Sequence, residues 1–400
     1  MRLREFARAG HWPTLACAFL YFDLSFMLWM LLGALGVFIA QEFGLSPSQK
    51  GLLVAVPVLS GAVLRLVMGV ASDRWGARRV GMAGMLLTAL PLVWGGWAMS
   101  RFVEGLGVGA LLGVAGASFA VALPLASRWY PPRYQGLAMG IAGAGNSGTV
   151  LAALFAPRLA EHIGWHGVFQ LALVPLLLVF CCFTLFARDN PGQAGHRTAY
   201  RQLLRESDLW RLNLFYTITF GGFVGLASFL PIFFCDQYGC SRVAAGTWAA
   251  ACVFAGSFLR PFGGSLADRF GDVRVLRVLY MVVIALVMAL ANLPAFPYAL
   301  TLLVLTTGSL GMGNGAVFQL VGQRFHREVG VATGIVGACG GVGGFLLPSS
   351  LGLLKEVGGS YGLGFVAFAV AATGAAVALA IAQREWQQTW GGLRTEAAPG

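Results

Sequence analysis

GVASDRWGARR, at residues 69–79, recurs in degenerate form as GSLADRFGDVR at residues 264–274. The two stretches lie 195 residues apart, and each one follows directly after a long apolar segment. Two further pairs have the same spacing: Arg65 and Arg260, and Tyr21 and Tyr216. Several matches at one spacing, with no gaps needed, indicate that the chain consists of two like-oriented halves.

The composition identifies the environment of these halves. Of the 400 residues, 58% are hydrophobic and only 11% are charged, with a mean hydropathy of +0.75. Because a soluble domain carries about 25% charged residues, this composition indicates a membrane protein in contact with the lipid bilayer. The net charge of +11 does not indicate a nucleic-acid partner, since no zinc-type spacing, basic helix or aromatic RNA motif accompanies it.

The apolar segments predict an all-α membrane protein with twelve transmembrane helices in two six-helix repeats. A span needs about 20 apolar residues. The predicted spans are 14–40, 51–72, 80–98, 103–126, 136–160, 165–187, 209–235, 243–265, 275–293, 298–322, 331–354 and 361–383. We therefore expect an N-terminal half at 1–187, a cytoplasmic linker at 188–208, a C-terminal half at 209–384 and a cytoplasmic tail at 385–400.

The basic residues predict the orientation. Of the 27 Lys and Arg residues, 20 fall on the side of the N-terminus and five on the opposite side. The positive-inside rule then places both termini in the cytoplasm of a multi-pass inner-membrane protein. Two basic residues remain, Arg65 and Arg260, and both lie inside predicted spans.

A central arginine in a span costs at least about 2.5–3.5 kcal/mol, so it is expected to face a cavity or a partner. Arg65 lies eight residues from Asp73, or about 12 Å along a helix. Among the 16 acidic residues, only Asp23 lies deep in a predicted span. This leaves unmatched positive charge, and the planar fork of a guanidinium suits a small planar oxyanion. The alternative is a structural arginine pair satisfied by carbonyls and water.

The repeated stretches place an acid and an arginine at matched helix ends: Asp73 and Arg74 in the first half, Asp268 and Arg269 in the second. Such groups can form a breakable contact that latches one conformation. The alternative is that the arginines only set topology; the aspartate and glycine positions, which add nothing to topology, favour gating. The stretch at 69–79 resembles the signature loop between the second and third spans of the major facilitator superfamily, which implies that fold for the whole chain.

Two glycine-rich runs occur in the fifth and eleventh predicted spans, GAGNSG at residues 143–148 and GACGGVGGF at residues 337–345. Glycines permit close helix packing in a membrane bundle, and Asn146 offers an amide donor. The glycines that match between the two runs, and that we expect to pack helices, are Gly145, Gly148, Gly340 and Gly343.

These runs, together with FDLSFMLW at residues 22–29, resemble the nitrate/nitrite porter family of the major facilitator superfamily. The resemblance implies that Arg65 and Arg260 clamp nitrate or nitrite, and that aromatic rings sandwich the planar ion. It assigns four further substrate contacts: Phe119, Tyr216, Phe220 and Asn146. For each aromatic residue alone, ordinary helix packing is the simpler interpretation. The family expectation for the assembly is a monomer.

Asp23 is the residue that could couple transport of the anion to movement of a proton. If its protonation follows occupancy of the anion site, the protein is a nitrate/proton symporter. The alternatives are a fixed hydrogen bond or salt bridge at Asp23 with nitrate/nitrite antiport, or a transporter for another small anion such as a carboxylate or phosphate ester. A membrane enzyme or sensor is disfavoured because we find no metal-ligand cluster, nucleotide loop or nucleophile motif. We therefore predict no catalytic residue, no metal and no cofactor.

Overall fold

A computed structural model describes residues 5, 9–190, 203–325 and 329–389 of the chain. These residues form helices and connecting turns without any strand, so the predicted all-α fold is confirmed. In the described residues, eleven helices are long and apolar enough to cross a membrane. The longest of them, Leu137–Phe186, is interrupted at Gly164, whose φ of 72° and ψ of 160° are not helical. Counting its two parts separately gives the twelve predicted spans.

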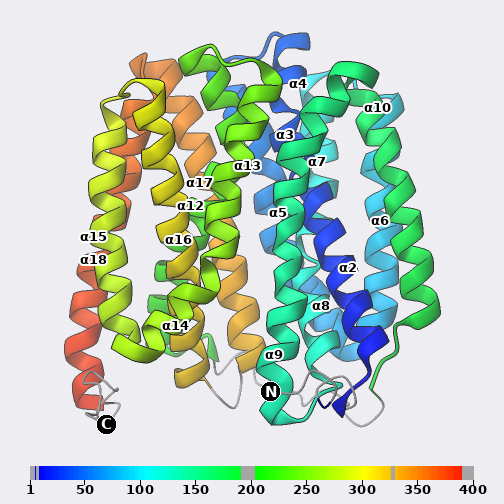
Figure 1. Ribbon diagram of the computed structural model, residues 1–400, viewed down its shortest axis with the longest axis vertical. Coiled ribbons are helices and arrows are strands. Elements are labelled where there is room, and N and C mark those ends of the chain that lie inside the picture. The colour runs from blue at the N-terminus through cyan, green and yellow to red at the C-terminus, as the bar shows by residue number, and fades with distance from the viewer. Residues whose placement is uncertain (1–4, 6–8, 191–202, 326–328, 390–400) are drawn as a thin grey trace. The chain divides into compact units, whose positions relative to one another are not determined.

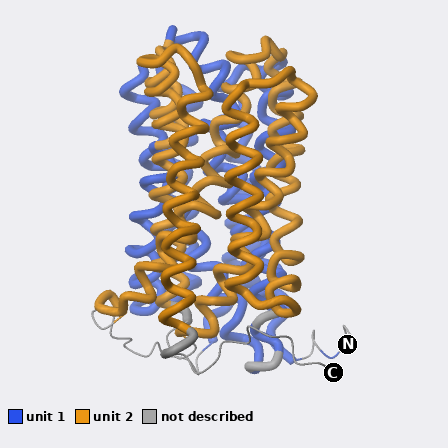
Figure 2. Tube along the Cα trace, turned by 90° about the vertical axis from the view of Figure 1, so that its left-hand side faces the viewer, with its two compact units in different colours: residues 1–44, 56–198 blue, residues 45–55, 199–400 orange. Residues whose placement is uncertain are grey.

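The chain divides into two compact units (Figure 2). Unit 1 consists of residues 1–44 and 56–198. Helix α2 contacts α10, α8, α9 and α7. The elements of unit 1 (Figure 1) are α2 (Trp12–Trp29), α3 (Leu31–Ala34), α4 (Gly36–Glu42), most of α5 (Pro47–Trp75), α6 (Ala77–Trp97), α7 (Phe102–Gly116), α8 (Phe119–Ser127), α9 (Pro132–Gly143), the 3-10 turn η1 (Ala144–Ser147) and α10 (Gly148–Phe186).

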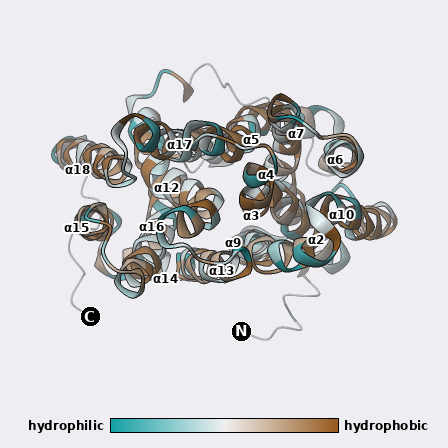
Figure 3. Cartoon of the chain, turned by 90° about the horizontal axis from the view of Figure 1, so that it is seen from above, coloured by the Kyte–Doolittle hydropathy of each residue, from teal (hydrophilic) through white to brown (hydrophobic). Residues whose placement is uncertain are grey.

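Unit 2 consists of residues 45–55 and 199–400. Helix α12 is buried along almost its whole length and packs on α17, α16, α13 and α18. The elements of unit 2 are α12 (Ser207–Tyr238), α13 (Arg242–Phe258), α14 (Arg260–Phe270), α15 (Asp272–Ala291), α16 (Phe296–Arg324), α17 (Val329–Gly358) and α18 (Gly362–Thr389). Exposed apolar side chains such as Val370 line α18, which Figure 3 colours largely as hydrophobic, as lipid contact requires.

Helix α5 is shared between the units, because residues 45–55 group with unit 2. The first turn of α5 is bonded to α17: Ser46 Oγ and the Ser48 N–H each donate to a Glu356 carboxylate oxygen at 2.8 Å. Lys50 Nζ lies 2.7 Å from an Asp236 carboxylate oxygen on α12. The helix that carries Arg65 in unit 1 therefore begins within unit 2.

The predicted linker and tail fall partly on residues that the structure does not describe, 191–202 and 390–400. Within the described residues, α12 begins at Ser207 and α18 continues to Thr389, so both helices extend a few residues into the segments predicted to be linker and tail. The predicted domain boundaries otherwise stay predictions.

The repeated DRWG and DRFG motifs form matched helix ends. Gly76 follows α5 with φ 90° and ψ 141°, and Gly271 follows α14 with φ 88° and ψ 132°. This backbone region is accessible essentially only to glycine. The glycine of each motif therefore makes the sharp turn between one span and the next.

Candidate functional site

Arg65 lies inside α5 with only 3% of its surface exposed. Its Nε donates a hydrogen bond to the Gly116 carbonyl oxygen at 3.0 Å. That carbonyl is available because α7 ends at Gly116, and the Ala120 N–H, four residues on, donates to the Ala117 carbonyl oxygen at 3.0 Å instead. A break between two helices thus supplies the polar partner of a buried cation.

Aromatic rings surround the Arg65 guanidinium. Its carbon lies 5.9 Å from the ring centroid of Phe26, 5.3 Å from Trp29 and 5.6 Å from Phe119. These distances are typical of cation–π contacts. Phe22 extends the cluster, at 4.3 Å from the Phe26 centroid and 5.8 Å from that of Phe119. The FDLSFMLW stretch therefore places aromatic residues at helical spacing on the side of α2 that faces Arg65.

Glycines allow Trp29 to reach this position. A Cβ on Gly61 would lie 3.2 Å from the indole nitrogen of Trp29, and one on Gly116 would lie 2.5 Å from it. The same nitrogen donates to the Pro57 carbonyl oxygen at 2.8 Å. Sequence reasoning missed Phe26 and Trp29, although their spacing from Phe22 on the quoted stretch was a usable signal.

Asn146 lies in η1, the 3-10 turn between α9 and α10, and is 6% exposed. The next residue, Ser147, donates through its hydroxyl to an Asp23 carboxylate oxygen at 2.6 Å. The Gly148 N–H also donates to the Asp23 carboxylate. The structure thus brings the predicted residues Asp23 and Asn146 into one local arrangement of unit 1.

Arg260 occupies the matching place in unit 2, at the first residue of α14. Its Nη2 donates to the Tyr216 hydroxyl oxygen at 3.3 Å, and its guanidinium carbon lies 5.1 Å from the Phe318 ring centroid. Tyr216 and Phe220 are stacked, with centroids 5.0 Å apart and planes only 6° apart. The predicted residues Tyr216 and Phe220 therefore lie together, and Tyr216 contacts Arg260; Phe318 was missed.

The predicted packing glycines lie in close helix contacts. A Cβ on Gly145 would lie 2.8 Å from the Asp23 backbone nitrogen, and one on Gly148 would overlap the Asp23 carbonyl oxygen. In unit 2, a Cβ on Gly340 would lie 2.6 Å from the Tyr216 ring. One on Gly343 would overlap the Thr217 carbonyl oxygen.

The predicted gating residues lie in exposed last turns of α5 and α14. Asp73 forms an ion pair with Arg128, at 2.7 Å between its carboxylate oxygen and Arg128 Nη2. In unit 2, Asp268 instead accepts from Gln319 Nε2 at 2.7 Å. The sequence placed Arg128 among the topology residues and so missed it as the partner of Asp73.

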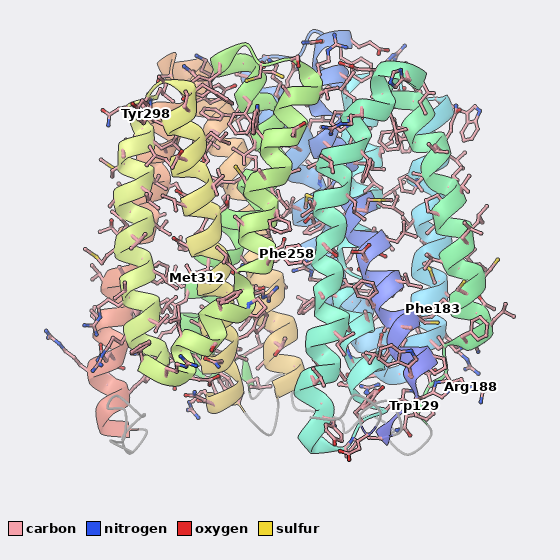
Figure 4. All side chains as sticks on the ribbon, in the orientation of Figure 1. Trp129, Phe183, Arg188, Phe258, Tyr298 and Met312 are labelled. Carbon is pink, nitrogen blue, oxygen red and sulfur yellow. The ribbon has the colours of Figure 1, made fainter. Side chains whose placement is uncertain are left out.

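Further hydrogen bonds at this end of unit 1 join the segment after α10 to its neighbours. Trp129 Nε1 donates to the Arg188 carbonyl oxygen at 2.7 Å, and Figure 4 labels both residues. Asn190 Nδ2 donates to the Arg128 carbonyl oxygen at 2.6 Å. The Arg78 N–H donates to an Asp189 carboxylate oxygen at 2.9 Å.

Comparisons with known proteins cover most of the chain. The sequence model of the Major Facilitator Superfamily matches residues 17–348. A protein of Bacillus subtilis named "Nitrite extrusion protein" is 35% identical over 351 residues, which cover 86% of this chain and 87% of that protein. A Thermus thermophilus protein named "Probable nitrate/nitrite antiporter NarK1" is 33% identical over 369 residues, or 82% of each chain.

Solved structures show the same fold. The crystal structure of a bacterial homologue of the human lysosomal transporter Spinster matches with a TM-score of 0.78 and 20% sequence identity. The match covers 96% of this chain and 98% of that one.

Proposed function

The chain belongs to the nitrate/nitrite porter family of the major facilitator superfamily, and we propose that it is a secondary active transporter that moves nitrate or nitrite across the cytoplasmic membrane. The names of its relatives support this substrate. In this architecture two six-span halves alternately expose a central site to either side. We propose that the protein works in this way, as a monomer with both termini in the cytoplasm.

The buried guanidinium of Arg65 is the observation that carries the proposal. Its neighbours include a carbonyl oxygen and three aromatic rings, groups that stabilise a buried cation. Arg260, at the repeat-related position, lies beside a phenol hydroxyl and a ring face. We propose that each unit contributes one arginine to the same anion, with the neighbouring aromatic rings and the Asn146 amide completing its environment.

Uptake of labelled nitrate by the pure protein in liposomes tests this proposal. We expect nitrate and nitrite to compete with the label, and formate and phosphate to compete poorly, because a small planar monoanion fits between guanidinium forks and rings. Arg65→Lys and Arg260→Lys keep the charge but lose the fork, so each should raise the nitrate KM at least about tenfold. Near-normal KM in both variants would refute the clamp. Equal competition by phosphate would indicate a different anion.

The coupling mode is a second part of the proposal. We propose nitrate/proton symport with Asp23 as the proton carrier. Nitrate/nitrite antiport is the competing candidate, and the printed name of the Thermus thermophilus relative favours it. Imposing a proton gradient on one set of vesicles and loading nitrite into another separates the two. Symport predicts uptake driven by the gradient and lost in Asp23→Asn, whereas antiport predicts uptake only against internal nitrite.

A further inference from the structure

One of the repeat-related points at which the two units differ lies in the fifth and eleventh spans. In unit 1 the fifth span contains the 3-10 turn η1, Ala144–Ser147, between α9 and α10. In unit 2 the corresponding helix α17 is continuous from Val329 to Gly358, although its glycine run is longer. Each residue of a 3-10 turn advances about 120° around the axis, against about 100° in an α-helix. The turn therefore changes the direction in which Asn146 projects.

Asp23 of α2 stabilises this turn from outside the helix. Its carboxylate accepts from Ser147 Oγ at 2.6 Å and from the Gly148 N–H. Within the turn the same N–H also donates to the Asn146 and Gly145 carbonyl oxygens. Ser147 occupies the N-cap position of α10 without accepting a capping bond through its own side chain, so the carboxylate takes the place of the cap. An anion at this end of a helix is also favoured by the helix dipole.

The backbone of Asp23 also packs against Gly145, the residue before Asn146. A Cβ on Gly145 would lie 2.8 Å from the Asp23 nitrogen and 2.9 Å from the Phe22 ring. The residues before and after Asn146 thus both contact the same residue of α2. Phe22, its neighbour, contacts Phe119 of the aromatic cluster around Arg65. One turn of α2 therefore connects the Arg65 cluster to the segment that carries Asn146.

Comparison of the two halves shows that Asp23 and Ser147 occur only in the half that contains Asn146. At the spacing of 195 residues, Asp23 corresponds to Ile218 and Ser147 to Val342, while Asn146 corresponds to Gly341. The half without the amide also lacks the carboxylate and the hydroxyl. Accordingly, the polar pair is not needed to pack the first span of a half against its fifth, because unit 2 packs α12 on α17 without it.

We propose that Asp23 and Ser147 are positioning residues, which hold η1 in its 3-10 form so that the Asn146 amide is aimed at the anion. The proposal rests on the proposed nitrate site, and it adds a role for Asp23 that does not require proton transfer. The amide oxygen of Asn can accept the same two hydrogen bonds as the carboxylate. Asp23→Asn therefore separates the two roles, because it retains the acceptor and cannot carry the proton.

Nitrate exchange at fixed pH in liposomes, with KM and maximal rate measured separately, tests this role. Ser147→Ala removes the hydroxyl donor, and we expect the nitrate KM to rise about fivefold to tenfold, the effect of one lost hydrogen bond. Ser147→Thr restores a hydroxyl and should return KM to within about twofold of wild type. Thr217→Val is the matched control: it removes a bond from Thr217 Oγ1 to the Cys339 carbonyl oxygen between α12 and α17 and should leave KM unchanged.

A double-variant cycle distinguishes positioning from a purely structural role. If Ser147 acts through Asn146, then Ser147→Ala should raise KM by less than about twofold in an Asn146→Ala background. Asp23→Asn should keep the exchange KM within about threefold of wild type, and Asp23→Ala should raise it as Ser147→Ala does. Additive effects, or a lowered Tm with unchanged KM, would overturn the positioning role. Failure of the wild-type protein to exchange nitrate would instead refute the proposed function.

Discussion

The guanidinium of Arg65 is held by a backbone carbonyl oxygen and by three aromatic rings. Each cation–π contact with Phe26, Trp29 or Phe119 is worth about 0.5–2 kcal/mol, depending on desolvation. Together with the Gly116 carbonyl they offset a cost of at least about 2.5–3.5 kcal/mol for a central arginine. These contacts hold a cationic side chain inside the helix bundle of unit 1.

Phe119→Leu tests the aromatic contribution at the scale of one residue. Leucine keeps most of the apolar volume and loses the ring face, so we expect the nitrate KM to rise about threefold to tenfold, with little change in Tm. Phe183→Leu is the matched control, since Phe183 is a buried phenylalanine of the same unit that contacts Tyr21 and Gly81 (Figure 4). Equal KM values in wild type and Phe119→Leu would exclude a role for this ring in binding.

At this scale, sequence predicted best the residues that stand out from an apolar background. Arg65 and Arg260 were identified because a charge in a span is costly, whereas Tyr216 and Phe220 were assigned by the family resemblance. Phe318 was not predicted. The residue that corresponds to Phe119 at the spacing of 195 is Asn314, and Phe318 lies four residues after it on α16. The ring over Arg260 is displaced by one helical turn, which only the folded chain reveals.

Glycine packing can be tested at the scale of the helix, because each unit offers a tightly packed glycine and a control glycine in open space. A Cβ on Gly343 would overlap the Thr217 carbonyl oxygen, whereas one on Gly334, in the same helix, would meet nothing within 4 Å. We expect Gly343→Ala to destabilise the protein by about 1–3 kcal/mol. Gly334→Ala should be neutral or stabilising by up to about 1 kcal/mol.

The same comparison applies in unit 1. Gly148→Ala meets the Asp23 backbone and Gly140→Ala meets nothing within 4 Å. Thermal unfolding in detergent should lower Tm for Gly343→Ala and Gly148→Ala only. A similar fall for all four variants would mean that the glycines act through chain flexibility and not through close helix contact.

The helix ends carry a second prediction at this scale. The ion pair of Asp73 with Arg128 is partly exposed, with 36% and 25% of the two side chains accessible. Such pairs contribute about 0–1 kcal/mol to stability. Arg128→Gln copies the residue at the repeat-related position, Gln323. If the pair latches one conformation, this variant should change the maximal transport rate by up to about fivefold with Tm almost unchanged.

Arg79→Gln controls for the loss of a positive charge, because Arg79 is an exposed arginine just after the same turn. Transport rates of both variants are compared at saturating nitrate. A rate for Arg128→Gln equal to that of wild type would leave these residues with topology as their only role.

Among the elements, sequence predicted the spans but not the breaks inside the first, fourth, fifth and eighth of them. The glycines of both runs weaken an isolated helix by about 1 kcal/mol each, yet the longer run in α17 stays helical. The turn η1 forms where Asp23, more than 100 residues away in the chain, supplies an acceptor. Local helix propensity therefore indicated a weak helix. The hydrogen bond between Ser147 and Asp23 marks where the α-helix gives way to the 3-10 turn.

At the scale of the whole molecule, the spacing of 195 residues predicted two like halves. It did not predict that residues 45–55 group with unit 2. Residues 45–55 group with unit 2, where Ser46 Oγ and the Ser48 N–H donate to Glu356 and Lys50 Nζ pairs with Asp236. Hydropathy ends a span where polar residues begin, so it placed the start of this span at residue 51. The structure begins α5 at Pro47, four residues earlier.

The last prediction concerns both units at once. A ligand that binds only the folded protein stabilises it by about 2.7 kcal/mol at 100 times its Kd. Nitrate should therefore raise the Tm of the pure protein in detergent by at least about 2 °C, whereas phosphate should not. If Arg65 and Arg260 hold the same anion, Arg65→Lys and Arg260→Lys must each remove most of this shift. Loss in one variant and retention in the other would mean that the anion binds to a single unit.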